Sequence, residues 1–218
     1  MKFIGIFVRI LCKRNMTRNI IFDFGAVLVD WNPHYVFDNY FGDRDKADRF
    51  LSEICNMEWN SQMDAGKPFD QGVAELSAVH PEWKKEIELY RDRWTDMMGD
   101  AVPGMYDLVK SLKDRGLKIY GLTNWSAETF YRICGNYPVF SLLDGKVVSG
   151  EEHVIKPSPE IYRILLDRYG LVPEESVFID DNPANAAAAS ALGIKGIVFT
   201  GAEALRKTLD ELLNADNQ

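Results

Sequence analysis

The sequence predicts an α/β protein: a Rossmann-like three-layer core, in which helices cover a parallel sheet, plus an inserted helical cap. Two observations support this fold class. From Ala101 onward, short apolar segments alternate with helical patterns, which implies parallel strands joined by right-handed crossovers. Residues 32–100 instead carry apolar residues at spacings of three and four, with no convincing strand. We therefore predict a core of residues 17–31 and 101–218 and a cap of residues 32–100.

The first strand is predicted in the segment NIIFDFGAVLVD, which begins at Asn19. Its Ile-Ile-Phe run suits a strand that is covered on both faces. The run leads directly into Asp23 and then Gly25, where the missing Cβ lets the chain turn away and bring its backbone close to a ligand. The strand therefore delivers an acid to the edge of the sheet.

Four segments of the predicted cap have helical patterns. Pro81 fits the first turn of the last helix, because a proline there loses no bond inside the helix. Gly66 and Gly99 mark breaks in the pattern. The four segments are HYVFDNYF, DKADRFLSEICNM, PFDQGVAELSAVH and PEWKKEIELYRDRW.

The rest of the core is predicted as an alternation of helices and strands. Gly116 is expected to end the first helix in a left-handed conformation. Ser158 and Asn182 are expected to cap two later helices, each followed by a proline in the first turn. The predicted helices are MYDLVKSLKDR, SAETFYRIC, EIYRILLDRYG, ANAAAASALG and GAEALRKTLDELLN, the strands are LKIYGL, ESVFID and KGIVFT, and VFSLLDGKVVSG is a turn or short edge strand.

The composition is that of a globular protein. The 218 residues are 46% hydrophobic and 27% charged, with a net charge of -8, a pI near 5.0 and a mean hydropathy of -0.21. The negative charge argues against nucleic acid or a membrane surface as a partner. Cys12, Cys55 and Cys134 are scattered, which favours reduced thiols over disulfides or a zinc site, so we predict a cytoplasmic protein.

Residues 1–16 are predicted to be an N-terminal extension. Residues 1–15 are apolar and basic, but Arg9 interrupts an apolar run that is too short for the about 20 residues of a membrane-spanning helix. No small-residue cleavage pattern follows. Since Met16 stands immediately before the first strand, a start codon assigned too early and a weak amphipathic segment at a membrane surface also remain open.

Polar residues stand at the ends of several predicted strands and before one helix. The carboxyl ends of parallel strands face one crevice. We therefore expect one site formed by Asp23, Thr123, Asn124, Lys156, Asp180 and Asp181.

Three of these residues are acids. Two carboxylates about 4 Å apart repel by roughly 4 kcal/mol at an effective dielectric constant near 20, so either the acids take up protons or a cation neutralises them. An oxygen-only ligand set favours Mg²⁺. We predict that the Asp23 side chain, the Gly25 carbonyl oxygen and Asp180 bind Mg²⁺, with Asp181 nearby.

Four segments resemble, in order and separation, the four motifs of the haloacid dehalogenase (HAD) superfamily, most of whose members are magnesium-dependent phosphatases. They are NIIFDFGAVLVD, LKIYGLTN, EEHVIKPSPE and ESVFIDDNPAN, and the resemblance covers nearly the whole chain from about residue 17.

The resemblance implies a role for each site residue. Asp23 is implied as the nucleophile that accepts the phosphoryl group. The Thr123 hydroxyl and the Asn124 backbone amide are implied to bind phosphoryl oxygens, and Lys156 to offset charge on both nucleophile and phosphate. Trp125, which follows Asn124, is a candidate wall of the substrate pocket, although core packing is at least as common for an aromatic side chain.

Gly25 departs from the pattern of the superfamily. Its phosphatases usually have a second aspartate at this position, which protonates the leaving oxygen and later activates water. Such help is worth typically about 10²–10⁴-fold, so we expect slow turnover of poor leaving groups without loss of phosphoryl transfer. The Asp-x-Gly pattern resembles that of some sugar-phosphate phosphatases, and it leaves substrate, water or a cap residue as the proton source.

The sequence thus predicts a Mg²⁺-dependent phosphatase that hydrolyses a small phosphomonoester, with a sugar phosphate favoured, through an aspartyl-phosphate. One alternative is a 2-haloacid dehalogenase, which needs no metal and is disfavoured by the Asp180-Asp181 pair. Another is a catalytically weak phosphate-binding protein. The predicted partner is a small phosphorylated metabolite, and the chain is expected to be a monomer or a homodimer.

Overall fold

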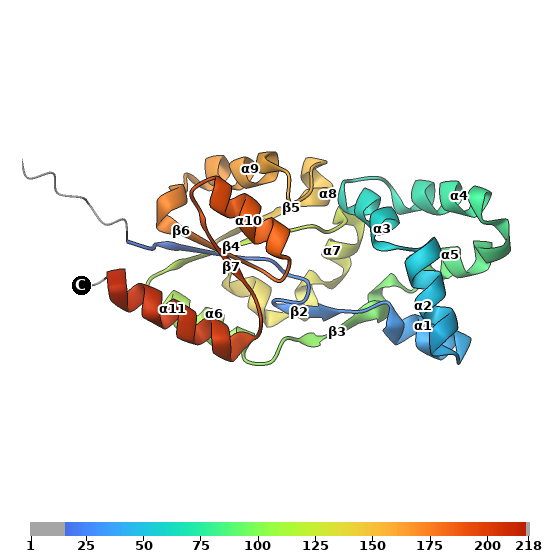
Figure 1. Ribbon diagram of the computed structural model, residues 1–218, viewed down its shortest axis with the longest axis horizontal. Helices are drawn as coiled ribbons and strands as arrows, with labels where there is room; N and C mark the ends of the chain where they lie inside the picture. The colour runs from blue at the N-terminus through green and yellow to red at the C-terminus, as the bar shows by residue number, and fades with distance from the viewer. Residues whose placement is uncertain (1–15, 217–218) are drawn as a thin grey trace, which may run out of the picture.

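The computed structural model describes residues 16–216, and its centre is a five-stranded parallel sheet (Figure 1). The strand order is β5-β4-β1-β6-β7, and every neighbouring pair is parallel. The predicted fold class is therefore confirmed. The strands are β1 (Asn19–Phe22), β4 (Lys118–Thr123), β5 (Gly145–Val148), β6 (Ser176–Asp180) and β7 (Lys195–Val198).

Alternation along the central strand explains why helices cover both faces of the sheet. Successive side chains of a strand point to opposite faces. Ile21 packs in a cluster with residues of α9 (Pro159–Tyr169) and α10 (Pro183–Ala191). Ile20 and Phe22 belong to the other cluster, with residues of α6 (Met105–Asp114) and α11 (Ala202–Asp216). All four residues of β1 are buried, as the apolar run predicts.

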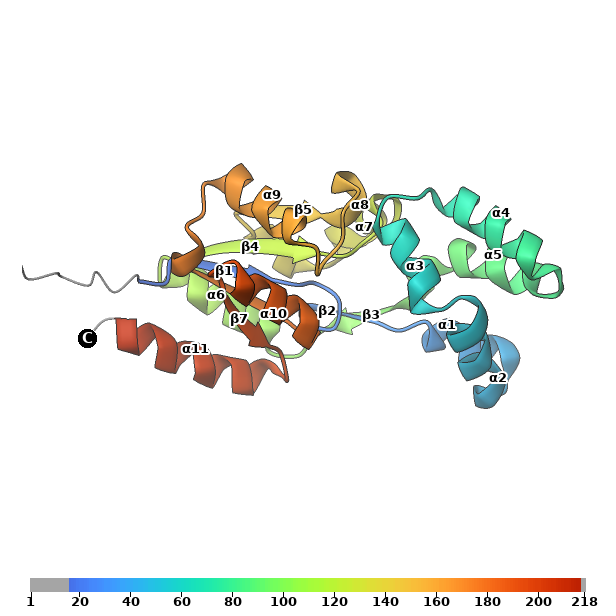
Figure 2. The same ribbon diagram turned by 45° about the horizontal axis from the view of Figure 1, so that its top comes forward.

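The residues between Trp31 and Met98 form helices that lie beyond the carboxyl ends of the central strands (Figures 1 and 2). The predicted helices at residues 34 and 68 are present, with boundaries within a residue or two. The helices of this region are α1 (His34–Phe41), α2 (Arg44–Arg49), a π-helical stretch (Phe50–Ile54), α3 (Met57–Asp64), α4 (Phe69–Val79), a 3₁₀ turn (Pro81–Trp83), α5 (Lys84–Asp92) and a second 3₁₀ turn (Trp94–Met97). The division into core and cap domains itself stays a prediction.

Two features of this region differ from the sequence prediction. A two-stranded antiparallel sheet, β2 (Val29–Trp31) with β3 (Met98–Ala101), joins the helical region to the core. Propensity could not reveal β3, because it contains Gly99 and Asp100, which are depleted in strands. The predicted helix DKADRFLSEICNM also ends early, and its last residue instead begins α3.

The predicted helix SAETFYRIC is present as α7 (Ala127–Ile133). Four further short elements were not predicted: two 3₁₀ turns (Cys134–Asn136 and Pro138–Leu142), α8 (Ser149–Glu152) and a 3₁₀ turn before β6 (Pro173–Glu175). Gly116 has a φ of +87°, the expected left-handed conformation. Asn182 caps α10 by accepting a hydrogen bond from the Ala184 N–H. Ser158 occupies the N-cap position of α9, as predicted, but its hydroxyl bonds to Glu160 and not to the backbone of the helix.

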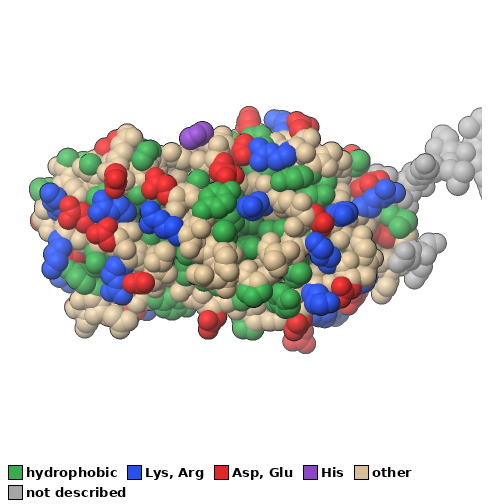
Figure 3. All heavy atoms as spheres, turned by 180° about the vertical axis from the view of Figure 1, so that it is seen from behind, with side chains coloured by type: hydrophobic (Ala, Val, Ile, Leu, Met, Phe, Trp, Pro, Cys, Tyr) green, Lys and Arg blue, Asp and Glu red, His purple; other side chains and the backbone are tan. Residues whose placement is uncertain are grey.

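The surface carries both signs of charge. On the face opposite to that of Figure 1, Lys and Arg side chains are interspersed with Asp and Glu (Figure 3). Within residues 16–216, no helix combines the length and the apolar character needed to cross a bilayer. Residues 1–15, where the N-terminal extension is predicted, lie outside the described residues.

Candidate active site

The carboxyl ends of three adjacent strands bring the predicted site residues together. Asp23 follows β1, Thr123 is the last residue of β4, and Asp180 is the last residue of β6. The Asp23 N–H donates to the Ile179 carbonyl oxygen at 2.9 Å, so the pairing of β1 with β6 continues into the site. The sheet register thus places two acids, 157 residues apart in sequence, beside each other.

Lys156 lies between these two acids. Its Nζ is 2.8 Å from Asp23 Oδ1 and 2.6 Å from Asp180 Oδ2. It also donates to the Leu122 carbonyl oxygen at 3.0 Å. An ammonium group has three protons, so all three are engaged. The side chain of Lys156 is 1% exposed, and its predicted contact with substrate therefore stays a prediction.

Two asparagines hold this arrangement in place. Asn124 Oδ1 accepts from the Lys156 N–H at 2.7 Å, and its Nδ2 donates to the Lys156 carbonyl oxygen at 3.0 Å, which fixes the loop that carries the lysine. Asn185 Nδ2 lies 3.1 Å from both carboxylate oxygens of Asp180. The sequence did not lead us to predict Asn185 as a site residue. It is the one amide side chain within the alanine run of α10, and this contrast is the signal that could have identified it.

Burial and neighbouring charges shift the pKa values of Asp23 and Lys156. Burial raises the pKa of Asp23 to about 6, because the opposing effect of Lys156 is partly cancelled by the negative charge of Asp180. Burial alone would lower the pKa of Lys156. The two carboxylates outweigh burial and raise that pKa above its usual value, so the lysine is held as a cation.

Three acids offer a set of oxygen ligands for a cation. Asp23, Asp180 and Asp181 each present a carboxylate oxygen, and these oxygens lie within 4.8 Å of one another. Asp181 is the exposed member of the three, and partial burial of its carboxylate, followed by repulsion from Asp180, raises its pKa. Lys156 supplies one positive charge to three acids. The donor set therefore fits a hard divalent cation, which would supply the missing charge.

A cavity of about 380 Å³ opens beside these acids, between the strand ends and the helical region. Gly25, Asn124 and Asp181 form its core side, and Asn60, Ser61 and Asp64 of α3 face them. Its apolar lining consists of Ala26, Trp31, Met57, Trp94 and Trp125. A larger and more open hollow of about 890 Å³, at the start of α11, contains none of the predicted site residues.

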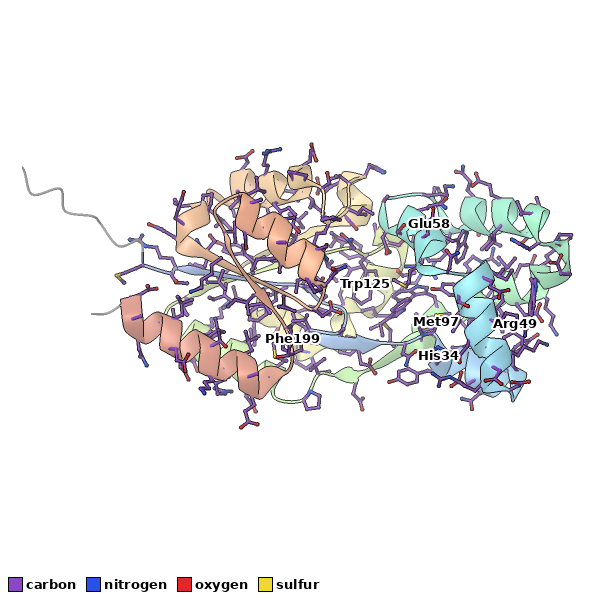
Figure 4. The ribbon with its side chains drawn as sticks, viewed as in Figure 1. His34, Arg49, Glu58, Met97, Trp125 and Phe199 are labelled. Carbon is purple, nitrogen blue, oxygen red and sulfur yellow. The ribbon has the colours of Figure 1, made fainter. Side chains whose placement is uncertain are left out.

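Trp125 belongs to the cavity wall and to the core at once. It lies where the core faces the helical region (Figure 4). Its Nε1–H donates to Thr129 Oγ1 at 3.1 Å, and its ring lies 5.6 Å from that of Trp94. Trp125 is only 4% exposed, which confirms its packing in the core, whereas its contact with a substrate stays a prediction.

Gly25 and Thr123 both lie at the site, Gly25 in the cavity wall and Thr123 at the end of β4. Gly25 lines the cavity, and a methyl group added at its Cα would meet no heavy atom within 4 Å. The site therefore has room where the second aspartate is missing. The roles predicted for the Gly25 carbonyl oxygen and the Thr123 hydroxyl stay predictions.

Replacing Asn185 by alanine is expected to lower kcat by roughly 10- to 100-fold, the usual cost of losing a group that orients a metal-binding or catalytic side chain. The reason is that Asp180 loses the amide that bridges both of its carboxylate oxygens and is held only by Lys156 and the Asn182 N–H. Steady-state kinetics on a phosphate monoester would measure the effect. Ser190→Ala, on the same helix but bonded to the Ala186 carbonyl oxygen, is the matched control. Equal kinetics for both variants would contradict the assignment.

Comparison with known proteins gives consistent matches. The profile of the haloacid dehalogenase-like hydrolase family matches residues 17–193. A sesquiterpene phosphatase, astK, of Aspergillus oryzae is 30% identical over 88% of this chain and 95% of its own length. A D-ribitol-5-phosphate phosphatase of Bacteroides thetaiotaomicron is 23% identical over 92% of this chain and 100% of its own.

Among solved structures, a HAD-family enzyme from Bacteroides thetaiotaomicron, in complex with magnesium and inorganic phosphate, is similar to this chain with a TM-score of 0.65. The identity is 22%, and the match covers 85% of this chain and 95% of that one. At this identity the likeness shows a shared fold.

Proposed function

The chain belongs to the haloacid dehalogenase-like hydrolase family and is a hydrolase of the phosphatase type, and on this premise we propose that it hydrolyses a small phosphomonoester with Mg²⁺, through a phosphoryl group carried on Asp23. The observation that carries the proposal is the pairing of Lys156 with Asp23 and Asp180, at 2.8 and 2.6 Å, beside a cavity of substrate size.

Asp23 is the group best placed to attack phosphorus. Its Oδ1 is held by the Phe24 N–H at 2.7 Å and by Lys156 at 2.8 Å, which fixes the carboxylate. Its side chain is 12% exposed, whereas that of Asp180 is fully buried. One oxygen of Asp23 forms a bond to phosphorus as the bond to the leaving oxygen breaks, and water then releases inorganic phosphate and restores the carboxylate.

The other residues act on charge and position. Lys156 keeps Asp23 ionised and therefore nucleophilic, and it neutralises part of the charge that gathers at the site. Asn124 holds the backbone of Lys156, while its own N–H, with the Thr123 hydroxyl, is the proposed donor to phosphoryl oxygens. Mg²⁺, held by Asp23, the Gly25 carbonyl oxygen and Asp180 with Asp181 beside them, would neutralise the acids and the phosphoryl oxygens.

Removal of divalent cations is expected to suppress the activity. Without a cation, one lysine faces three acids, and an incoming phosphate meets net negative charge. Hydrolysis of an activated aryl phosphate should fall to background in EDTA and return on addition of excess MgCl₂. Full activity in EDTA would contradict a metal-dependent mechanism.

A dehalogenase is separated from a phosphatase by the same assay. Release of halide from a 2-haloacid in EDTA, without phosphate release from any monoester, would support the dehalogenase. A phosphate-binding protein without turnover would instead hydrolyse nothing and show a phosphate-dependent rise in melting temperature.

The substrate is proposed to be a small phosphorylated metabolite in the cytoplasm, with a sugar phosphate favoured. The mixed cavity wall supports this, because Asn60 and Ser61 can bond to hydroxyls while the tryptophan rings pack against a sugar ring. The named activity of the D-ribitol-5-phosphate phosphatase also supports it. Cys55 and Cys134 are free thiols, as suits a reducing compartment.

A sesquiterpene phosphate is the second candidate substrate, favoured by the three tryptophans and one methionine of the wall and by the named activity of astK. A panel of sugar, polyol and isoprenoid monophosphates would separate the two candidates by kcat/KM.

A further inference from the structure

The leaving oxygen of a phosphomonoester needs a proton when its bond to phosphorus breaks, and position 25 offers no side chain to give it. The cavity beside Gly25 does contain a carboxyl group that the mechanism above does not use. Among the described residues that line it, the titratable side chains are Asp181, which belongs to the acid cluster, and Asp64. Asp64 is the last residue of α3 and so reaches the cavity from the helical region.

Hydrogen bonds from three elements hold Asp64 in one orientation. Oδ1 accepts from the Ser126 N–H at 3.1 Å, and Oδ2 accepts from Asn60 Nδ2 at 3.1 Å. The Asp64 carbonyl oxygen accepts from Ser149 Oγ at 2.5 Å. Asn60 is itself fixed, since its Oδ1 accepts from the Tyr90 hydroxyl at 3.2 Å. Each carboxylate oxygen has accepted one bond from protein and keeps a lone pair that can carry a proton.

The electrostatic surroundings of Asp64 suit proton transfer. Burial is the main influence on its pKa and raises it to about 7, with a further rise from the charge of Asp23. The Ser126 N–H, Asn60 and the charge of Lys156 act in the opposite direction, and the Tyr90 hydroxyl stays neutral and protonated. Both protonation states are therefore populated near neutral pH, as a group that first gives and then takes a proton requires.

We propose that Asp64 is the general acid and base of this site, taking the place of the side chain that position 25 lacks. Its carboxyl group gives a proton to the leaving oxygen as phosphorus moves to Asp23. The resulting carboxylate then takes a proton from the water that attacks phosphorus, so the cycle ends with alcohol, inorganic phosphate and protonated Asp64. The inference rests on the proposed phosphatase activity.

The decisive experiment compares leaving groups. The ratio kcat/KM reports the steps up to departure of the leaving group, so Asp64→Asn should lower it by roughly 10²–10⁴-fold for an alkyl phosphate. It should change little for p-nitrophenyl phosphate, whose leaving oxygen needs no proton. With the latter substrate the variant should instead release a burst of nitrophenol equal to the enzyme, because phosphorylated Asp23 hydrolyses slowly. Adding Gly25→Asp to this variant should restore turnover of the alkyl phosphate.

Glu128→Gln is the matched control, because Glu128 Oε1 also joins the core to the helical region, by accepting from the Phe69 N–H at 3.2 Å, but does not line the cavity. Any change in kcat/KM caused by Glu128→Gln should be the same for the alkyl phosphate and for p-nitrophenyl phosphate. An equal loss for both substrates in Asp64→Asn, without a burst, would assign Asp64 a positioning role and overturn the inference while the phosphatase activity stands. An inert wild-type enzyme would instead refute the proposed function.

A second test uses the wild-type enzyme alone and therefore does not depend on whether a variant folds. Asp64 must be protonated to act as an acid, so the ratio of kcat/KM for the alkyl phosphate to that for p-nitrophenyl phosphate should fall as pH rises through about 7. Taking the ratio cancels the ionisation of Asp23, and each substrate concentration is expressed as the dianion, because alkyl and aryl phosphates differ in their second pKa. A ratio that does not change with pH would also overturn the inference.

Discussion

Asp23→Asn is expected to lower kcat on the order of 10⁴-fold or more, the scale at which removal of a nucleophile acts. The amide is nearly the same size, and its oxygen can still accept from the Phe24 N–H and from Lys156. The fold should therefore survive, and only the attacking oxygen is lost. Steady-state hydrolysis of p-nitrophenyl phosphate measures the loss, and circular dichroism checks the fold.

Asp30→Asn is the matched control for this variant. Asp30 lies seven residues further along the chain, in β2, and its carboxylate accepts from the Tyr35 hydroxyl without joining the acid cluster. It should retain activity near that of the wild type. If Asp23→Asn and Asp30→Asn have equal activity, the nucleophile has been assigned to the wrong residue.

Lys156→Met is expected to damage both activity and stability. The variant leaves Asp23 and Asp180 buried beside each other without their shared cation, and breaking a buried ion pair in this way typically costs about 3–5 kcal/mol. Loss of a positive group at a phosphoryl-transfer site should lower kcat by roughly 10²–10³-fold or more. Urea denaturation and steady-state kinetics would measure the two effects.

Lys118→Met separates these effects from the general loss of a lysine. Lys118 begins β4, its side chain is 62% exposed, and it lies 3.4 Å from Asp144. Exposed pairs contribute about 0–1 kcal/mol, so this variant should remain stable and active.

MgCl₂ should raise the melting temperature of Lys156→Met more than that of the wild type, because a cation at the three acids replaces the lost charge. A Lys156→Met protein as stable and active as the control would show that the pair is unimportant.

The sequence predicted the core well because the signals there are local and strong. The apolar run before Asp23 and the run ending at Asp180 are fully buried strands in the structure. The rule that parallel strands end at one crevice brings Asp23 and Asp180 together, as observed, and Lys156 reaches both from the loop before α9. The predicted family is confirmed by the match over residues 17–193.

The parts that could not be predicted depend on contacts between distant residues. The strand β3 forms because the chain returns beside β2 after the helical region, and its own composition does not favour a strand. Asn185 reaches Asp180 only because α10 follows β6 by a tight turn. Asp64 enters the cavity because α3 packs against Ser126 and Ser149, which are 62 and 85 residues away in sequence.

Mass spectrometry of the enzyme quenched in acid during turnover tests the central claim most directly. Acid stabilises an acyl phosphate long enough for digestion, and the Asp64→Asn variant should accumulate it. We predict that the mass of one phosphoryl group appears on the peptide that contains Asp23, in Mg²⁺ but not in EDTA. Steady hydrolysis of substrate with no phosphorylated peptide, or with the group on a residue other than Asp23, would contradict the account.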